Sequence, residues 1–206
     1  MSKIILKFFL RLDNFCYRII SVLAIKVNKG IHPKHRIINY HQFFLDNIKA
    51  GDMVLDIGCG SGELSFDLAK KASKVIGIDL NKQYLEKAKK KNKAQNIKYV
   101  LGDATNYIFN EKFDIVVLSN VLEHIENRKE FLLKIKGLAV KILIRAPLLT
   151  RDWLSVYKKE IGVEPRLDKT HFIEYTKEGF IEEIKEAGLA IEELSINFGE
   201  IYAKLQ

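Results

Sequence analysis

Three glycines at alternate positions, Gly58, Gly60 and Gly62, follow a short apolar run in the stretch M-V-L-D-I-G-C-G-S-G. Glycine has no Cβ and adopts positive φ readily, so a ligand can lie directly against the backbone of such a loop. A helical pattern begins after the glycines, and the free N–H groups of its first turn point back at that ligand. The stretch therefore predicts a strand, a tight loop and a helix around a bound small molecule.

Two carboxylates indicate which kind of small molecule this is. Asp79 ends the next apolar run, where an acid can accept hydrogen bonds from ribose hydroxyls. Asp56, just before the glycines, suits a cationic group better than a pyrophosphate. The spacing G-x-G-x-G also differs from the dinucleotide fingerprint G-x-G-x-x-G, because Glu63 stands where the third small residue belongs. Cys59, inside the loop, is expected to be a small filler and not a nucleophile.

A second set of reactive side chains lies in residues 148–175, which we predict to be irregular. Loops this long inside a compact domain are usually functional. Arginines beside aromatic faces could hold a sugar ring and flank phosphates or carboxylates. The predicted substrate residues are Arg151, Trp153 and Tyr175 in this stretch and Arg145 just before it. Arg145 breaks an otherwise apolar strand end, which favours a functional head group over a packed one.

Three side chains are candidates for catalysis. His171, with Asp168 three residues earlier to orient it, has the chemistry of a general base for an oxygen acceptor or of a substrate ligand. His124, in an E-H-I turn, could face the reacting atoms. The alternative for each is that it fixes its loop through hydrogen bonds. No metal site is predicted, since Cys16 and Cys59 have neither zinc spacing nor a disulfide framework.

The charge is concentrated at one end of the chain. Of a net charge of +8, residues 1–36 carry +7, from eight lysines and arginines against Asp13 alone, which leaves +1 for residues 37–206. A nearly neutral body makes a nucleic-acid partner unexpected. With 206 residues and 48% hydrophobic content, the chain fits one domain, 37–206, and a helical extension, 1–36.

Residues 3–29 predict one amphipathic helix with a basic stripe. Its longest uncharged run is 19–25, much shorter than the roughly 20 residues that span a bilayer, and no signal-peptide cleavage site follows. Such a helix could lie in a membrane interface against anionic lipid, or it could pack on the domain or on a second subunit. The expected location is cytoplasmic, with peripheral attachment to the inner face of the membrane as one alternative.

From residue 53 onward, strand and helix patterns alternate. Strands are predicted at 53–57, 74–79, 97–101, 113–119, 140–145, 189–195 and 199–205, and helices at 62–72, 82–94, 127–137 and 177–187. A second helix, closing at Gly51, precedes them. This alternation predicts an α/β fold, a mostly parallel sheet with helices on both faces and ligands beyond the carboxyl ends of its strands.

The stretch D-I-G-C-G-S-G, together with V-I-G-I-D-L, closely resembles the class I S-adenosylmethionine-dependent methyltransferases, and the resemblance runs from about Tyr40 to Leu194. It implies a Rossmann-like seven-stranded sheet in the order 3-2-1-4-5-7-6 with the last strand antiparallel, and S-adenosyl-L-methionine as cofactor. In the family, the position of Asp103 hydrogen-bonds the adenine amine and that of Ala104 packs on the ring. The implied cofactor residues are Asp56, Gly58, Cys59, Gly60, Gly62, Asp79, Leu80, Asp103, Ala104, Asn120 and Val121.

The loop patterns P-x-x-x-x-x-W, D-x-T-H and E-Y-T resemble methyltransferases encoded among polysaccharide and lipid-sugar biosynthesis enzymes. This resemblance implies O-methylation of a small-molecule or glycan-linked acceptor. A lipid or quinone-like acceptor, an RNA and a non-catalytic partner subunit remain alternatives. The strand that ends at Ser119 lacks the proline motif of enzymes that methylate exocyclic amines of nucleobases.

Overall fold

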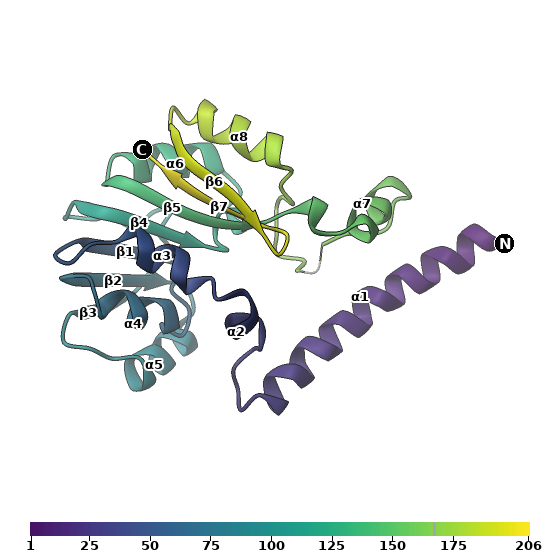
Figure 1. Ribbon diagram of the computed structural model, residues 1–206, viewed down its shortest axis with the longest axis horizontal. Helices are drawn as coiled ribbons and strands as arrows, with labels where there is room; N and C mark the ends of the chain where they lie inside the picture. The colour runs from purple at the N-terminus through teal and green to yellow at the C-terminus, as the bar shows by residue number, and fades with distance from the viewer. Residues whose placement is uncertain (167) are drawn as a thin grey trace.

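A computed structural model describes residues 1–166 and 168–206. Seven strands form one sheet in the order β3-β2-β1-β4-β5-β7-β6, in which β7 runs antiparallel to both of its neighbours (Figure 1). The predicted topology is thus confirmed. The strands are β1 (Met53–Ile57), β2 (Lys74–Asp79), β3 (Ile97–Leu101), β4 (Phe113–Ser119), β5 (Ala139–Pro147), β6 (Ile191–Asn197) and β7 (Glu200–Leu205).

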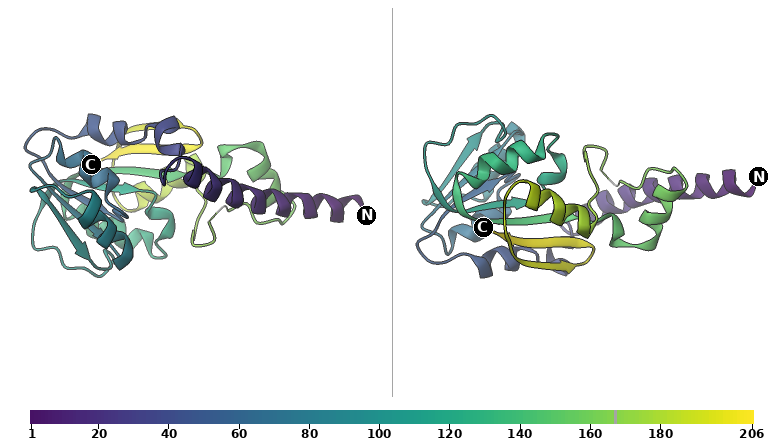
Figure 2. Two further views of the ribbon diagram at one scale, coloured as in Figure 1. Left: turned by 90° about the horizontal axis from the view of Figure 1, so that it is seen from below. Right: turned by 90° about the horizontal axis from the view of Figure 1, so that it is seen from above.

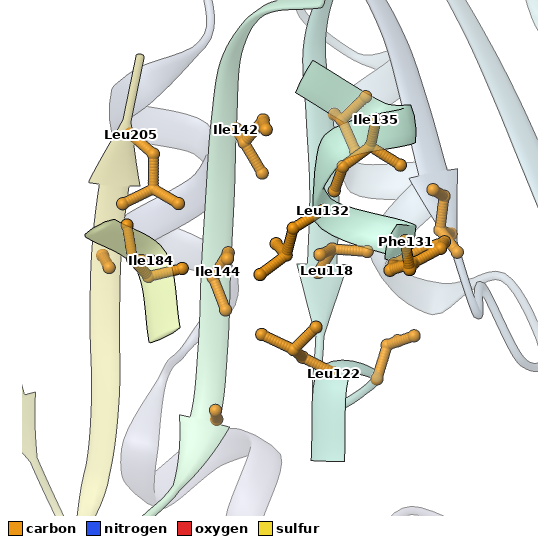
Figure 3. Close-up of a cluster of buried hydrophobic side chains, with 14 of the residues drawn as sticks. Leu118, Leu122, Phe131, Leu132, Ile135, Ile142, Ile144, Ile184 and Leu205 are labelled. Atoms are coloured by element: carbon orange, nitrogen blue, oxygen red, sulfur yellow. The ribbon is translucent and has the colours of Figure 1, made fainter. Parts of the chain in front are cut away.

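Hydrophobic residues alternate between the two faces of the sheet because successive strand side chains point to opposite sides. Leu118 of β4 belongs to a core with α6 (Arg128–Lys136) and α8 (Lys177–Glu186). Figure 3 shows this core, with Ile135 of α6 and Ile184 of α8 labelled. Its neighbour Val117 belongs to a second core with α3 (His41–Asn47) and α4 (Glu63–Ala69). Both faces of the sheet are therefore covered, and only the strand ends are left for a ligand.

The helices differ from the predictions in four places, the first being α4, which was expected to reach residue 72 and ends at Ala69. The helix expected before Gly51 is two helices, α2 (Lys34–Ile38) and α3, because Asn39 adopts a left-handed conformation with φ of 50°. The helix expected to reach residue 94, α5 (Lys82–Lys91), ends earlier. Residues 148–175 are not irregular throughout: they contain α7 (Trp153–Glu160), which begins where the Asp152 carboxylate accepts a hydrogen bond from Ser155 N at 2.7 Å. An aspartate at this position is a strong helix start.

The N-terminal helix α1 (Ser2–Val27) extends away from the sheet domain and passes beside α7 (Figures 1 and 2). The contact is polar: Lys158 Nζ lies 2.5 Å from Asp13 Oδ2 and 2.7 Å from Asn14 Oδ1, and Asn14 Nδ2 donates to the Glu164 carbonyl at 2.8 Å. Most apolar side chains of α1 stay exposed. Among residues 1–166 and 168–206, no helix combines the length and hydropathy needed to cross a membrane.

Candidate active site

A cavity of about 440 Å³ opens at the carboxyl ends of the parallel strands. Strands β1, β2 and β4 end side by side, so the residues that follow them gather at one edge of the sheet. The predicted cofactor residues that line this cavity are Gly58, Gly60, Asp79, Leu80, Asp103, Ala104, Asn120 and Val121. A volume of this size is typical of a small-molecule site.

Asp79 fixes the glycine loop from the end of β2. Its Oδ2 accepts a hydrogen bond from Gly60 N at 2.8 Å, and its Oδ1 accepts one from Asn81 N at 2.7 Å. A carboxylate has about four acceptor positions, so two of them remain for ligand hydroxyls. The same side chain can therefore shape the loop and bind a ribose.

Asp103 and Asn120 provide the other polar contacts of this cavity. Hydrogen bonds from Thr105 hold the pKa of Asp103 below its ordinary value, so the carboxylate stays ionised as an acceptor. Asn120 adopts φ of 55°, and its buried Oδ1 has no hydrogen-bond partner among the described residues. Since a buried unpaired acceptor is costly, Asn120 is suited to an amino group of a ligand. The residues present thus fit a nucleoside that carries an amino acid tail.

Three of the predicted cofactor residues support the cavity from outside it. Asp56 is buried and accepts a hydrogen bond from Ser65 Oγ at 2.5 Å, and burial raises its pKa to about 7. Its expected contact with a cationic group is therefore wrong: it ties β1 to α4. The buried Cys59 side chain packs beside Gly77, and burial raises the pKa of the thiol, which agrees with its role as a filler. Gly62 begins α4 at φ of 82°.

A second cavity, of about 450 Å³, adjoins the first and shares Asn120 with it. One wall is the α1 segment from Tyr17 to Val22. Arg151 and His171 also line the cavity. Charged side chains of both signs line the cavity, which makes it suitable for a polar molecule. The shared Asn120 marks the place where ligands in the two cavities would meet.

The two candidate histidines lie at this junction. His124 lines the first cavity and His171 the second, and their ring centroids are 4.6 Å apart at nearly right angles. The predicted orientation of His171 by Asp168 is wrong, because His171 Nδ1 instead bonds Glu174 Oε1 at 2.8 Å. Asp168 accepts from Thr170, whose hydroxyl oxygen lies 2.9 Å from His124 Nδ1.

Electrostatics set the charge of this cluster. Burial opposes the positive form of His171, but the hydrogen bond to Glu174 and the nearby Glu123 outweigh it, so the pKa of His171 lies above its ordinary value. Burial, together with the charge of His171, lowers the pKa of His124. Sequence reasoning missed Glu123 and Glu174, although Glu123 directly precedes His124 and Glu174 follows His171 at helical spacing.

The predicted substrate residues lie in different surroundings, and Arg151 is the one that lines a cavity. Arg151 lines the second cavity and pairs with Glu174 at 2.9 Å. Tyr175 is fully buried in the core and its hydroxyl donates to Glu183, so its role as a substrate contact is wrong. Trp153 is 74% exposed and is not among the described residues that line either cavity; its role stays a prediction.

Arg145 is held inside the protein. It donates two hydrogen bonds to Glu200, from Nε at 2.6 Å and from Nη2 at 2.8 Å, and its guanidinium carbon lies 3.8 Å from the centre of the Tyr40 ring. The apolar strand end around Arg145 suggested a functional head group, but the charge is matched by Glu200 of the neighbouring β7. Its predicted substrate contact is corrected to a structural one behind the second cavity.

Part of the chain is similar to known proteins. Residues 54–139 match the family described as "Methyltransferase domain". Demethylmenaquinone methyltransferase of Lactobacillus johnsonii is 35% identical over 96 residues, which cover 43% of this chain and 39% of that protein. Cypemycin N-terminal methyltransferase of a Streptomyces species is 32% identical over 90 residues, which cover 43% of this chain and 37% of that protein. The chain thus spans less than half the length of these curated relatives.

A solved structure extends the similarity beyond the matched segment. The S-adenosylmethionine-dependent methyltransferase from Clostridium acetobutylicum superposes with a TM-score of 0.65 over 93% of this chain and 98% of that chain, at 16% identity. At this identity the likeness shows the fold alone, and the fold is the one described above.

Proposed function

We propose that this chain is a class I S-adenosylmethionine-dependent methyltransferase, with S-adenosyl-L-methionine as its cofactor, and that it methylates an oxygen of a small-molecule or glycan-linked acceptor. The cofactor occupies the cavity at the ends of β1, β2 and β4. The acceptor occupies the second cavity. The observation that carries this proposal is that the two cavities meet at Asn120, beside the histidine pair.

When bound, the cofactor would supply a methyl group on a sulfonium, with S-adenosylhomocysteine as the leaving group of the transfer to the acceptor oxygen. The protein's task is to align the acceptor with that carbon and to exclude water, because proximity supplies much of the rate enhancement. A hydroxyl acceptor must also lose its proton. We assign this task to His171, as the proton acceptor or as the group that holds the reacting oxygen, with Glu174 as its positioning residue.

The lining of the second cavity supports a polar acceptor. Lys34 and Arg151 offer positive charge, whereas Asp168 offers an acceptor for hydroxyl groups. Such a mixture is suited to a sugar that carries an anionic substituent. Because the sheet domain is nearly neutral, an RNA acceptor is disfavoured.

A lipid or quinone-like acceptor is the second candidate, and one observation favours it. The α1 segment that walls the second cavity belongs to a helix most of whose other apolar side chains are exposed, so an acceptor with an apolar tail could lie along α1. In that case the protein works in the cytoplasm at the inner face of the membrane. A gain of turnover in the presence of anionic vesicles would identify this acceptor class.

Replacing His171 by alanine should lower the turnover number by about 10²–10⁴-fold, the usual contribution of a positioned general base. Turnover is measured as S-adenosylhomocysteine released with an acceptor found by screening sugars, hydroxylated lipids and quinols. The affinity for S-adenosylhomocysteine should not change, because the predicted cofactor contacts lie elsewhere. His41→Ala is the control and should retain full turnover, because this histidine of α3 also bonds a carboxylate, that of Asp67 at 2.7 Å, but lines neither cavity. Unchanged turnover in His171→Ala would refute the assignment.

A further inference from the structure

Glu123 is the polar side chain that the methyl-transfer scheme leaves unexplained. It is completely buried, and both of its carboxylate oxygens lack a hydrogen-bond partner within the described part of the chain. A buried carboxylate is normally paired or bound to a metal. One ligating atom from each of Glu123, His124 and His171 lies within 4.8 Å of the other two. The unpaired carboxylate therefore faces two imidazoles and not an apolar core.

Hydrogen bonds at Nδ1 fix the imidazoles of His124 and His171 in the same tautomer. The Glu174 carboxylate can only accept, so His171 Nδ1 must carry the hydrogen in their 2.8 Å contact. The Thr170 hydroxyl donates its one hydrogen to Asp168 at 2.7 Å, so it must accept from His124 Nδ1. In the neutral form of each ring the free lone pair is then on Nε2.

We propose that Glu123, His124 and His171 bind a divalent transition-metal ion at the junction of the two cavities. Two neutral imidazoles and one carboxylate form a ligand set suited to Zn²⁺, Co²⁺, Fe²⁺ or Mn²⁺. Metal-bound histidines usually donate their other ring N–H to a carboxylate or a similar acceptor. His171 has such a contact with Glu174, and His124 has one with Thr170, which is held by Asp168. The ion also supplies positive charge beside Glu123, whose two carboxylate oxygens have no hydrogen-bond partner among the described residues.

The place of the ion gives it a role that rests on the proposed function. His124 borders the cofactor cavity and His171 borders the acceptor cavity, so coordination positions not used by the protein open toward the acceptor. A hydroxyl bound there loses its proton more readily, since a divalent cation strongly lowers the pKa of a bound oxygen. The proton passes to water in the acceptor cavity, the oxygen–carbon bond forms, and the carbon–sulfur bond of the cofactor breaks. His171 then holds the reacting oxygen through the ion.

Cobalt titration tests the site without any acceptor or turnover. The full-length protein, without a histidine tag, is stripped with a chelator and titrated with Co²⁺, and the visible absorption of protein-bound Co²⁺ is recorded. We expect saturation at one equivalent and full displacement by Zn²⁺. Glu123→Gln, which keeps the shape of the side chain, and His171→Ala should abolish the signal. Glu174→Gln should weaken binding about 10–100-fold, the usual effect of removing a contact behind a metal-bound histidine. His41→Ala should bind as the wild type does.

Titration of each variant with S-adenosylhomocysteine shows whether it is folded and separates the two proposals. A wild type that binds S-adenosylhomocysteine but gives no saturable Co²⁺ signal would overturn the metal site and leave the proposed function intact. So would a Glu123→Gln protein that binds Co²⁺ as tightly as the wild type. Conversely, Co²⁺ binding that depends on Glu123 in a protein that does not bind S-adenosylhomocysteine would support the metal site and contradict the proposed function.

Discussion

Replacing Gly58 by alanine should weaken S-adenosylhomocysteine binding at least about 100-fold, a loss of roughly 2.8 kcal/mol. A Cβ at this position would lie 2.5 Å from Val121 Cγ2, and the residue has φ of 68°, which alanine adopts only under strain. The strain costs about 1–2 kcal/mol, and relief of the overlap costs about 1–3 kcal/mol more. Both Gly58 and Val121 line the cofactor cavity, so any shift that relieves the clash changes the shape of that cavity. Calorimetric titration measures the effect.

Gly51→Ala is the matched control for the effect of positive φ alone. Gly51 has φ of 99°, and a Cβ there would have no heavy atom within 4 Å. This substitution should lower the free energy of unfolding without changing the affinity for S-adenosylhomocysteine. If Gly58→Ala bound the ligand as tightly as Gly51→Ala does, the glycine loop would not be the cofactor site.

Replacing Arg145 by alanine should lower the free energy of unfolding more than breaking an exposed ion pair does. Arg145→Ala leaves the Glu200 carboxylate buried with Lys34 as its remaining cation, at 2.8 Å and on a half-exposed side chain. Breaking a buried pair by removing one partner typically costs about 3–5 kcal/mol, since the other charge stays in a poorly solvated place. We expect a loss at the lower end of this range, about 3 kcal/mol, because Lys34 compensates in part. Urea denaturation measures the free energy of unfolding.

Two controls show whether the loss of stability in Arg145→Ala comes from the burial of the unpaired Glu200 charge. Lys129→Ala breaks an exposed pair with Glu186 at 3.5 Å and should cost less than about 1 kcal/mol. The double variant Arg145→Met/Glu200→Leu removes both charges and should recover most of the stability that Arg145→Ala loses. An Arg145→Ala protein no less stable than Lys129→Ala would show that the buried pair does not hold β5 to β7.

The sequence predicted best those features that depend on local pattern. Strands β1 to β4 begin and end at the predicted residues, because continuous apolar runs between glycines and polar residues leave little choice for a buried parallel strand. The glycine loop and Asp79 were predicted for the same reason, because the residues that form a backbone-lined pocket are close together in the sequence. The strand order came from the family resemblance and was confirmed by the sheet.

The errors concern contacts between distant segments. Arg145 looked like a functional head group because its partner Glu200 lies on another strand. Tyr175 looked like a substrate contact because nothing local shows that α8 buries it. The cluster of Glu123, His124 and His171 forms only when two segments fold together, so a search for metal spacing among cysteines could not find it. By contrast, α7 had a readable signal, the Asp152 cap, which the expectation of a long loop concealed.

Calorimetric titration of the wild type and of Asp79→Ala with S-adenosylhomocysteine tests whether the cavity at the ends of β1, β2 and β4 is the cofactor site. We expect micromolar binding by the wild type and affinity at least about tenfold weaker in Asp79→Ala, since a hydrogen bond to a charged group is worth about 1.5–3 kcal/mol. Asp114→Ala is the matched control, because Asp114 also holds a backbone N–H, that of Met53 at 2.8 Å, but at the opposite end of the sheet. It should bind as the wild type does. A folded wild type that does not bind S-adenosylhomocysteine would contradict the account.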